Sequence, residues 1–383
     1  MVFWRGEVLR HLREYVDAED IDNVAKLQKG NSAAEVYCCR VKLHGVDKSV
    51  RYVAKVSPIT DIRTKDEYQR GIMLYNSAQE FCVHLVRPIC AFDIGDKSFQ
   101  FIEYAFGGHE DARTLMSVCE LRQCDIVANI SKEILLDLNQ DSHIEYVLAY
   151  PRICIGMILD RSTSKAKRFE QRVRKLIDDP CNPEIRYRGK VYPNPSYYIM
   201  KDCKWMDKYS SNLILGRIHG DLHAGNILCN RSSKEEYVLI DYAYSQQSTY
   251  LLFDNAYLEL SLYCNYFKKT EYQDIEGVFD QILCTKLETS IHQYGIHDLL
   301  FHYRNAICTG IRDWMVARKG SIMTHEIEVQ FAVARTAAGI HFFSQKHRNE
   351  EKELRFIWMY LSFCLKHLFD IIKSSDAVEK ISL

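Results

Sequence analysis

Apolar residues near the amino terminus recur at helical spacing. Val8, Leu12 and Val16 stand four residues apart and are separated mainly by polar side chains. This spacing is typical of the buried face of an amphipathic helix. We therefore predict a helix over residues 6–28, broken near Asp20, that leads into a first lobe.

Four short β-rich runs follow, in two pairs that each flank turn-forming residues. The first pair flanks His44-Gly45-Val46-Asp47 and the second flanks Gly95-Asp96, so each pair is typical of a hairpin. The predicted strands are residues 34–41, 51–56, 86–93 and 99–104. A helix is predicted between the pairs, over residues 64–79. These elements predict a small antiparallel-sheet lobe over residues 1–104.

The rest of the chain, residues 105–383, is predicted to be a mainly helical second lobe. Residues 122–138 carry an apolar stripe, and 326–343 and 353–369 are apolar along one side. Residues 140–210 are aromatic and turn-rich in part, and we interpret them as an insertion. Between Arg161 and Lys175 there are seven basic residues and one acidic residue. Such a face is ordinarily solvated; the alternative is contact with an anionic substrate or partner.

Composition limits the classes of function. A chain of 383 residues exceeds a typical single core, which supports two lobes. Its 50 basic and 51 acidic residues nearly cancel, so charge gives no indication of nucleic-acid or membrane-surface binding. The 14 cysteines include no C-x-x-C pair, which predicts free thiols in the reducing cytoplasm rather than a zinc site. We find no signal-peptide pattern and no run of membrane-spanning length.

Two acids and an amide are arranged at suggestive spacing in the stretch from His219 to Asp241. Asp221 precedes two short apolar runs, Asn226 begins the first run, and Asp241 follows the second. Turn-forming residues separate the runs, which predicts a hairpin. An acid before the first strand and another after the second can converge on one point. Carboxylate and amide oxygens suit a divalent cation that carries phosphate oxygens.

The segment HGDLHAGN, residues 219–226, resembles the catalytic loop of the aminoglycoside phosphotransferase and choline kinase family. The Leu-Ile-Asp ending at Asp241 is similar to the metal-binding strand end of the same family. This resemblance implies a two-lobed α+β fold of the protein-kinase-like type. Its amino-terminal lobe would hold a small antiparallel sheet, and its mainly helical carboxy-terminal lobe would contain a helical insertion.

The resemblance also implies an activity and its cofactors. The expected reaction is phosphotransfer from ATP or GTP, with Mg²⁺, to a hydroxyl of an unknown small-molecule or protein acceptor. Asp221 is implied as the catalytic residue that takes the acceptor proton, and Asn226 and Asp241 as the metal ligands. His219 is expected to brace the loop backbone. We expect neither a membrane nor a nucleic acid as a partner.

Lys55 lies in Val53-Ala54-Lys55-Val56, which resembles the lysine strand of kinases. A lysine in an apolar strand needs a counter-charge or water. The resemblance implies ATP phosphates and the helix carboxylate of Glu67, with Asp66 and Glu80 as alternative partners. The other interpretation is a lysine on an edge strand in solvent.

Two further parts of a nucleotide site are predicted from position. Gly30 and Ser32 would lie in a loop that covers the phosphates; with a single glycine, a plain hairpin turn is the simpler interpretation of that segment taken alone. The apolar strand that runs into Gly107-Gly108 resembles the hinge between kinase lobes. Adenine would there bond to backbone groups near Glu103 and Ala105.

Two alternatives to an active phosphotransferase remain open. Residues 185–262 also resemble the kinase-like ternary-complex-associated domains of bacterial signalling and defence proteins, through Pro193-Asn194-Pro195 and the segment LIDYAYS. That resemblance implies a role in regulatory assemblies with an unassigned substrate. The single-glycine loop and the large insertion also fit a catalytically silent nucleotide-binding module with partner proteins in a signalling or defence assembly. A metallohydrolase could instead use His219, Asp221, His223 and Asp241. The Tyr-Ala after Asp241, where protein kinases have Phe-Gly, argues against a regulated activation loop.

Overall fold

The computed structural model divides the chain into two compact units. Unit 1 comprises Met1–Val118, Asp137–Asp141 and His219–Gln247, and unit 2 comprises Cys119–Leu136, Ser142–Ile218 and Ser248–Leu383. The predicted first lobe falls within unit 1, which also takes in the stretch around the predicted catalytic loop. The structure describes residues 4–381 apart from positions 28–33, 48, 78, 108–111, 121–122, 141–144, 150, 152–154, 156–162, 202–203, 205–206, 208–209, 232, 234–235, 270–295, 319–323, 346–347 and 349.

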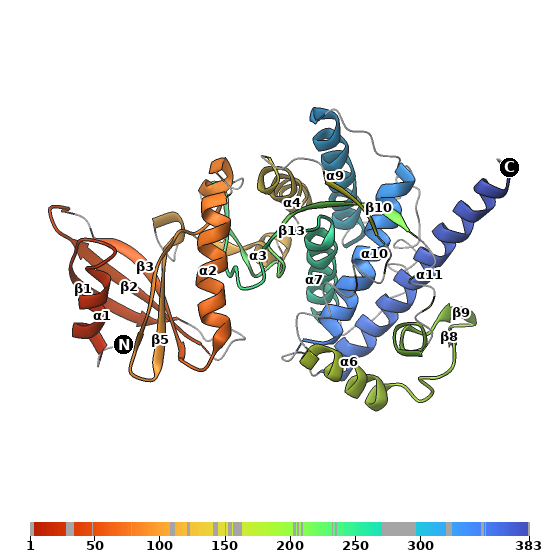
Figure 1. Ribbon diagram of the computed structural model, residues 1–383, viewed down its shortest axis with the longest axis horizontal. Helices are drawn as coiled ribbons and strands as arrows, with labels where there is room; N and C mark the ends of the chain where they lie inside the picture. The colour runs from red at the N-terminus through yellow and green to blue at the C-terminus, as the bar shows by residue number, and fades with distance from the viewer. Residues whose placement is uncertain are drawn as a thin grey trace. The chain divides into compact units, whose positions relative to one another are not determined.

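A five-stranded antiparallel sheet forms the centre of unit 1 (Figure 1). Its strand order is β1-β2-β3-β5-β4, and each neighbouring pair is antiparallel. The predicted hairpins correspond to β2–β3 and β4–β5, and both pairings are confirmed. The strands are β1 (Ala18–Lys26), β2 (Glu35–Leu43), β3 (Val50–Pro58), β4 (Pro88–Ile94) and β5 (Lys97–Glu103).

The prediction of one helix over residues 6–28 is wrong. A short helix, α1, spans Arg5–Leu12, and Ala18–Lys26 form the edge strand β1. Ile21 of β1 pairs with Val41 of β2. Pairing with a strand further along the chain decides this conformation, and local apolar spacing does not reveal such a contact.

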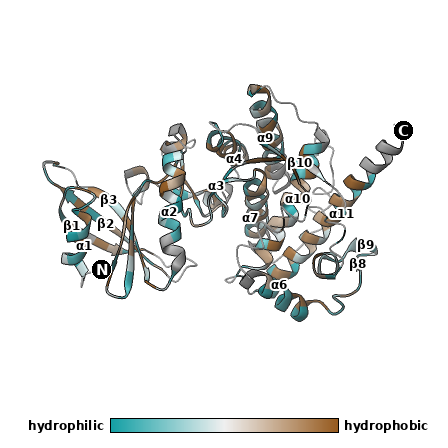
Figure 2. Ribbon diagram, viewed as in Figure 1, coloured by the Kyte–Doolittle hydropathy of each residue, from teal (hydrophilic) through white to brown (hydrophobic). Residues whose placement is uncertain are grey.

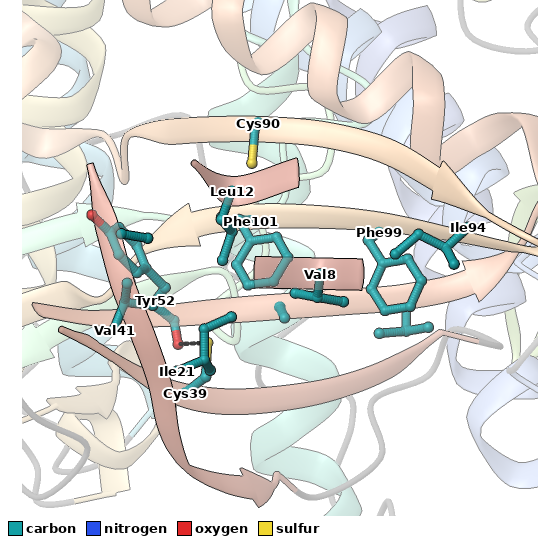
Figure 3. Packing of buried hydrophobic residues seen from close by; sticks show 13 residues of the cluster. Val8, Leu12, Ile21, Cys39, Val41, Tyr52, Cys90, Ile94, Phe99 and Phe101 are labelled. Atoms are coloured by element: carbon teal, nitrogen blue, oxygen red, sulfur yellow. Dashed lines mark hydrogen bonds between the residues drawn. The ribbon is translucent and has the colours of Figure 1, made fainter. Parts of the chain in front are cut away.

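Helix α1 contributes to the hydrophobic core on one face of the sheet. Val8 and Leu12 are fully buried with Phe99 and Phe101 of β5 (Figure 3). Side chains alternate between the faces of a strand. The members of this core from β3 are Tyr52, Ala54 and Val56. Lys55, between two of them, therefore faces away from this core.

The opposite side of unit 1 carries the elements that position the predicted catalytic loop. Helix α2 spans Ile62–Ser77, and the 3₁₀ segment η2 spans Gln79–His84. A second sheet, with strand order β12-β11-β6, contains β6 (Ala112–Thr114), β11 (Ile227–Asn230) and β12 (Tyr237–Leu239). Strands β11 and β12 are antiparallel, with Ile227 opposite Leu239. The hairpin predicted between Asp221 and Asp241 is thus confirmed.

Unit 2 is mainly helical, as predicted for the second lobe. A three-stranded sheet of order β13-β10-β7 accompanies the helices. In the part of the chain that the structure describes, no helix has the length and apolar character needed to cross a membrane. The elements wholly in unit 2 are α7 (Phe253–Lys269), α9 (Ile296–Ala317), α10 (Thr324–Phe343), α11 (Glu351–Ile381), β7 (Glu145–Ala149) and β10 (Ser211–Ile218). Three elements include residues of both units: α3 (Leu115–Glu120), α4 (Cys124–Leu138) and β13 (Gln246–Tyr250).

The predicted insertion contains both helix and strand. Helix α6 spans Thr163–Leu176 and is mainly hydrophilic (Figure 2). It is followed by the hairpin of β8 (Glu184–Tyr187) and β9 (Lys190–Pro193) and by a π-helical turn, Tyr197–Lys201. Together, the antiparallel sheet of unit 1 and the helices of unit 2 confirm the predicted α+β fold class.

Two arginines of α6 have a structural role that neither interpretation of this basic helix anticipated. Nε of Arg168 donates to the carbonyl of Ser344 at 2.8 Å, and Nη2 of Arg172 donates to that of Gln345 at 2.8 Å. These carbonyls lie just past the end of α10. Carbonyls at a helix end lack intrahelical donors, so the two guanidinium groups complete their hydrogen bonding.

Candidate functional site

Lys55 of β3 and Glu67 of α2 form a largely buried ion pair. The Lys55 ammonium contacts the Glu67 carboxylate, and the two side chains are 16% and 11% exposed. Asp66, considered as an alternative partner, is exposed to solvent. A buried charge requires a paired group, and the structure supplies Glu67. Lys55 is therefore not the solvated edge-strand lysine of the other interpretation.

Asp241 joins this pair from the turn that follows β12. Its Oδ2 lies 3.9 Å from Nζ of Lys55, and 41% of its side chain remains exposed. The backbone of Asp241 has φ +69°, a left-handed conformation that costs a non-glycine residue of the order of 1 kcal/mol. The turn thus holds an accessible carboxylate beside the Lys55–Glu67 pair.

His219 links the predicted catalytic loop to the turn that carries Asp241. Nε2 of His219 lies 2.8 Å from the carbonyl oxygen of Ile240. The Ile240 N–H in turn donates to the carbonyl of Asn226 at 3.0 Å. His219 is fully buried. Its ring braces the backbone, as the sequence predicts.

Asn226 closes the loop that begins at Asp221. Nδ2 of Asn226 donates to the backbone carbonyl of Asp221 at 2.9 Å. The His223 N–H also donates to the Asp221 carbonyl at 2.9 Å, and the Asn226 N–H donates to the His223 carbonyl at 2.8 Å. These bonds fold the segment into a compact turn. The half-buried side chain of Asp221 lies at its start.

The middle position of the His-Gly-Asp segment, residue 220, requires glycine. It has φ +79°, and a Cβ at this position would lie 2.1 Å from the carbonyl oxygen of Tyr244. Both the backbone conformation and the close approach exclude a larger residue. The turns that carry Asp221 and Asp241 therefore pack directly against each other.

The three charged groups alter one another's proton affinity. Burial alone would raise the pKa of Asp241, but the charge of Lys55, with His219 and His223 nearby, lowers it overall. Burial raises the pKa of Glu67, and the charge of Asp241 adds to this effect. Burial opposes protonation of Lys55, yet Asp241 and Glu67 raise its pKa. At neutral pH, Lys55 is thus protonated and Asp241 is ionised.

Sequence reasoning missed the residues that fix α2 beside Asp241. The buried Tyr242 hydroxyl accepts a hydrogen bond from the Val86 N–H at 2.6 Å. Its ring packs on α2 at Gly71, where a Cβ would lie 3.1 Å from Cδ2 of Tyr242. Nη1 of Arg70 donates to the carbonyl of Ala243 at 2.8 Å. The sequence did contain one signal of this close packing. Gly71 stands four residues after Glu67 and therefore lies on the same face of the helix, where a glycine leaves room for a neighbouring side chain.

The residues predicted from position are placed only in part. Glu103 ends β5, and its N–H donates to the carbonyl of Arg87 at 2.9 Å. Ala105 begins the 3₁₀ turn η3 (Ala105–Gly107), in which Phe106 has φ +54°. The chain therefore turns out of the sheet at the predicted hinge. Gly30 and Ser32 lie outside the described residues.

The donor set fits a small divalent cation. Asp241 offers an ionised, accessible carboxylate. Because Nδ2 of Asn226 bonds to Asp221, the amide oxygen of Asn226 is the atom that is left for a ligand. One carboxylate and one neutral oxygen suit Mg²⁺, which keeps several waters or phosphate oxygens. Within the described residues, no three His, Cys, Asp or Glu side chains are grouped as a metal cluster, so the metallohydrolase arrangement is not found there.

The sheet with its lysine–glutamate pair, the hydrogen-bonded loop and the strained aspartate turn agree with the α+β fold class predicted from the sequence. Comparison with protein families gives a more particular result. Residues 115–289 match the family model described as ternary complex associated domain 9. The match covers the catalytic-loop segment and the insertion that carried the second resemblance in the sequence. No protein with curated annotation matches the sequence significantly.

Solved structures similar to this chain include three kinases at low identity. An aminoglycoside-3'-phosphotransferase of type VIII is 15% identical, with 88% of this chain and 99% of that chain covered and a TM-score of 0.45. The choline kinase LicA from Streptococcus pneumoniae is 12% identical, with 96% and 99% covered and a TM-score of 0.43. A putative fructosamine-3-kinase from Haemophilus somnus 129PT is 10% identical, with 94% and 96% covered and a TM-score of 0.45. The resemblances stated from the sequence are those that the comparisons find.

Proposed function

We propose that this protein is an ATP- and Mg²⁺-dependent phosphotransferase that acts on a hydroxyl group. The observation that carries the proposal is the charge cluster in which Lys55 contacts Glu67 and lies 3.9 Å from Asp241. A metal–nucleotide complex supplies both an anion for Lys55 and a cation for Asp241. Phosphotransfer requires such positioning and charge neutralisation more than covalent chemistry from the protein.

Each residue of the cluster has one role in this proposal. Lys55 binds phosphate oxygens, and Glu67 holds the Lys55 ammonium in place. Asp241 and the amide oxygen of Asn226 hold Mg²⁺, which when bound offsets the charge of the outer phosphates. Asp221 orients the acceptor hydroxyl and accepts its proton. The acceptor oxygen then bonds to the γ-phosphorus as the bond to the nucleoside diphosphate breaks.

The remaining parts of the site are proposed from the order of elements. The base of ATP, or of GTP, bonds to backbone groups near Glu103 and Ala105, and the loop containing Gly30 and Ser32 covers the phosphates. The acceptor is a small molecule or a protein. We propose a cytoplasmic location, which the free thiols such as Cys39, Cys90 and Cys181 support.

Two substitutions at the site test the proposal. Asp221→Asn preserves the loop bonds made by the Asp221 backbone, so this variant should bind Mg²⁺-ATP normally and lose turnover. Asp241→Ala should lose the Mg²⁺-dependent part of binding. Isothermal titration calorimetry measures binding, and ADP release in the presence of pooled alcohol acceptors measures turnover. A wild-type chain that binds no nucleotide would refute the proposal.

A second candidate is a nucleotide-binding module without turnover that acts within a signalling or defence assembly. The match to a ternary complex associated domain over residues 115–289 favours it, because that description names an assembly and no reaction. The same measurements separate the two functions. Tight Mg²⁺-ATP binding with no ADP release from the wild type, and no effect of Asp221→Asn, would support the silent module.

A further inference from the structure

Positive charge is concentrated in one part of an otherwise balanced chain. Residues 161–204 contain 12 lysines and arginines but five aspartates and glutamates, whereas the whole chain has a net charge of −1. The remainder of the protein is therefore net acidic. A local excess of this size produces a positive surface potential on this part of unit 2.

Helix α6 separates its structural residues from its exposed basic ones. Phe169, Val173 and Leu176 are buried, at the i, i+4 and i+7 spacing of one helix face. Arg168 and Arg172, beside this face, donate to carbonyls past α10. Among the side chains of α6 that the structure describes, the exposed bases are Lys167, Arg174 and Lys175. Arg174 pairs with Glu170. Arg174 and Lys175 also lie near the carboxyl end of α6, where a positive charge interacts favourably with the helix dipole. Lys167 has neither of these roles among the described residues.

The β8–β9 hairpin adds exposed bases from a fixed framework. Residues opposite each other share a face, and Ile185 pairs with Tyr192, whose ring lies 4.4 Å from that of Phe363 on α11. The adjacent pair, Arg186 and Val191, therefore faces away from α11, and both residues are exposed. At the tip, Arg188 and Lys190 flank Gly189 and are also exposed.

The connection between α6 and the hairpin is held by side-chain hydrogen bonds. Nδ2 of the buried Asn194 donates to the carbonyls of Asp179 at 3.1 Å and Asn182 at 2.7 Å. The Ser196 hydroxyl donates to the carbonyl of Pro180 at 3.2 Å. The exposed bases on both elements are thus presented by one ordered framework. Pre-organisation of this kind lowers the entropic cost of binding.

Both elements contact α11 through aromatic side chains. Phe169 of α6 lies 6.3 Å from Trp358 between ring centroids, and Tyr192 of the hairpin lies 4.4 Å from Phe363. The two basic elements are therefore anchored on one helix of unit 2.

We propose that the insertion surface, defined by exposed Lys167, Arg174, Lys175, Arg186, Arg188 and Lys190, binds an acidic segment of a partner protein. Exposed Asp178, Asp179 and Glu184 interrupt the bases, and such acids would repel a continuous phosphate backbone. Val191, 42% exposed beside Arg186, gives the surface an apolar contact. Arginine beside apolar and aromatic side chains is typical of protein interfaces, so an acidic protein segment fits better than a nucleic acid.

Charge reversal on the hairpin tests the proposal without any nucleotide. The variant Arg186→Glu, Arg188→Glu and Lys190→Glu changes exposed positions and should fold normally. A matched control reverses three exposed bases of unit 1, Arg10, Lys42 and Arg87. The probes are a fluorescent peptide of repeated Glu-Glu-Leu units, its Lys-Lys-Leu counterpart, and a single-stranded DNA oligonucleotide of the same net charge as the acidic peptide. Fluorescence anisotropy is measured at several salt concentrations, and circular dichroism verifies the fold of each variant.

The proposal expects the wild type and the control variant to bind the acidic peptide with equal affinity. The hairpin variant should bind it about tenfold or more weakly, with a smaller salt dependence, and should gain affinity for the Lys-Lys-Leu peptide. Equal loss in the control variant would overturn the proposal, because net charge alone would then explain binding. Tighter binding of the oligonucleotide than of the peptide, lost in the hairpin variant, would overturn the assignment to a protein partner.

Discussion

Nε2 of His219 lies 2.8 Å from the carbonyl oxygen of Ile240, so a buried ring joins the start of the predicted catalytic loop to the turn that carries Asp241. We predict that His219→Leu lowers the free energy of unfolding by about 1–3 kcal/mol, because a buried carbonyl loses its donor. Urea unfolding followed by circular dichroism measures this change. His302, which is exposed on α9, provides the control, and His302→Gln should have little effect. An unchanged midpoint for His219→Leu would contradict the bracing role.

The Lys55–Glu67 pair should be coupled in stability as well as in nucleotide binding. Lys55→Met leaves Glu67 and Asp241 without their shared cation, and Glu67→Gln leaves Lys55 with Asp241 alone. We predict that a double-mutant cycle in urea gives a coupling energy of about 1–3 kcal/mol. Lys55→Met should also weaken Mg²⁺-ATP binding more than Glu67→Gln does. Asp66→Asn, on the neighbouring exposed residue, is the matched control and should change neither quantity.

The Tyr242 hydroxyl should stabilise the backbone at Val86 and at the end of β12. In Tyr242→Phe the Val86 N–H loses an acceptor at 2.6 Å, and we predict a loss of about 1–3 kcal/mol in unfolding free energy. Faster amide hydrogen exchange is expected at Val86 and in residues 239–243. Tyr68→Phe on α2 is the control, since its hydroxyl lies 3.5 Å from the Ile89 carbonyl, a much weaker contact. Equal exchange in the two variants would contradict this role.

The residues of the candidate site that could be predicted are those whose signal is local. Asp221, Asn226 and Asp241 lie around one hairpin, so their spacing along the chain already indicates convergence. Lys55 is a charge within an apolar strand, which itself requires a partner. The helix predicted at residues 64–79 then offered few carboxylates, and the structure selects Glu67.

The residues that could not be predicted depend on contacts between distant parts of the chain. The Tyr242 hydroxyl bonds to a backbone group 156 positions away, and nothing near either residue indicates this pairing. The edge strand β1 was mistaken for helix because Val8 and Leu12 have helical spacing, whereas Ala18–Lys26 is strand only through β2. Arg168 and Arg172 resembled other exposed bases, since their carbonyl partners lie more than 170 residues later.

Arg172 should contribute more to stability than any exposed base of α6. Its guanidinium donates to the carbonyls of Phe343, the last residue of α10, and of Gln345 and Arg348 beyond that helix. We predict that Arg172→Ala lowers the unfolding free energy by about 2–3 kcal/mol, because hydrogen bonds from a charged donor are lost together. Arg174→Ala is the control, since Arg174 is 73% exposed in its pair with Glu170 and should cost less than about 1 kcal/mol. Urea unfolding followed by circular dichroism measures both changes, and similar losses in both variants would contradict the prediction.

His367 should make the stability of unit 2 dependent on pH. This residue of α11 is buried, and neither ring nitrogen has a hydrogen-bond partner among the described residues. Burial, with the charges of Arg335 and Arg304, lowers the pKa of His367 to about 3, against smaller opposing effects of Asp370 and Glu259. Between the ordinary pKa of about 6.5 and about 3, the unfolded chain therefore binds a proton that the folded chain excludes. The stability that neutral His367 contributes is therefore fully present above a pH of about 6.5 and is lost as the pH falls below that value.

Replacement of His367 by leucine should remove this dependence. We predict that His367→Leu is at least as stable as the wild type at pH 7, because a buried polar ring without partners is replaced by an apolar side chain of similar size. Below the ordinary histidine pKa, the variant should gain on the wild type by up to about 1.4 kcal/mol for each pH unit. Urea unfolding at a series of pH values from 7 down to about 4 measures both quantities. Parallel pH profiles for the two proteins would show that another group controls the acid sensitivity of unit 2.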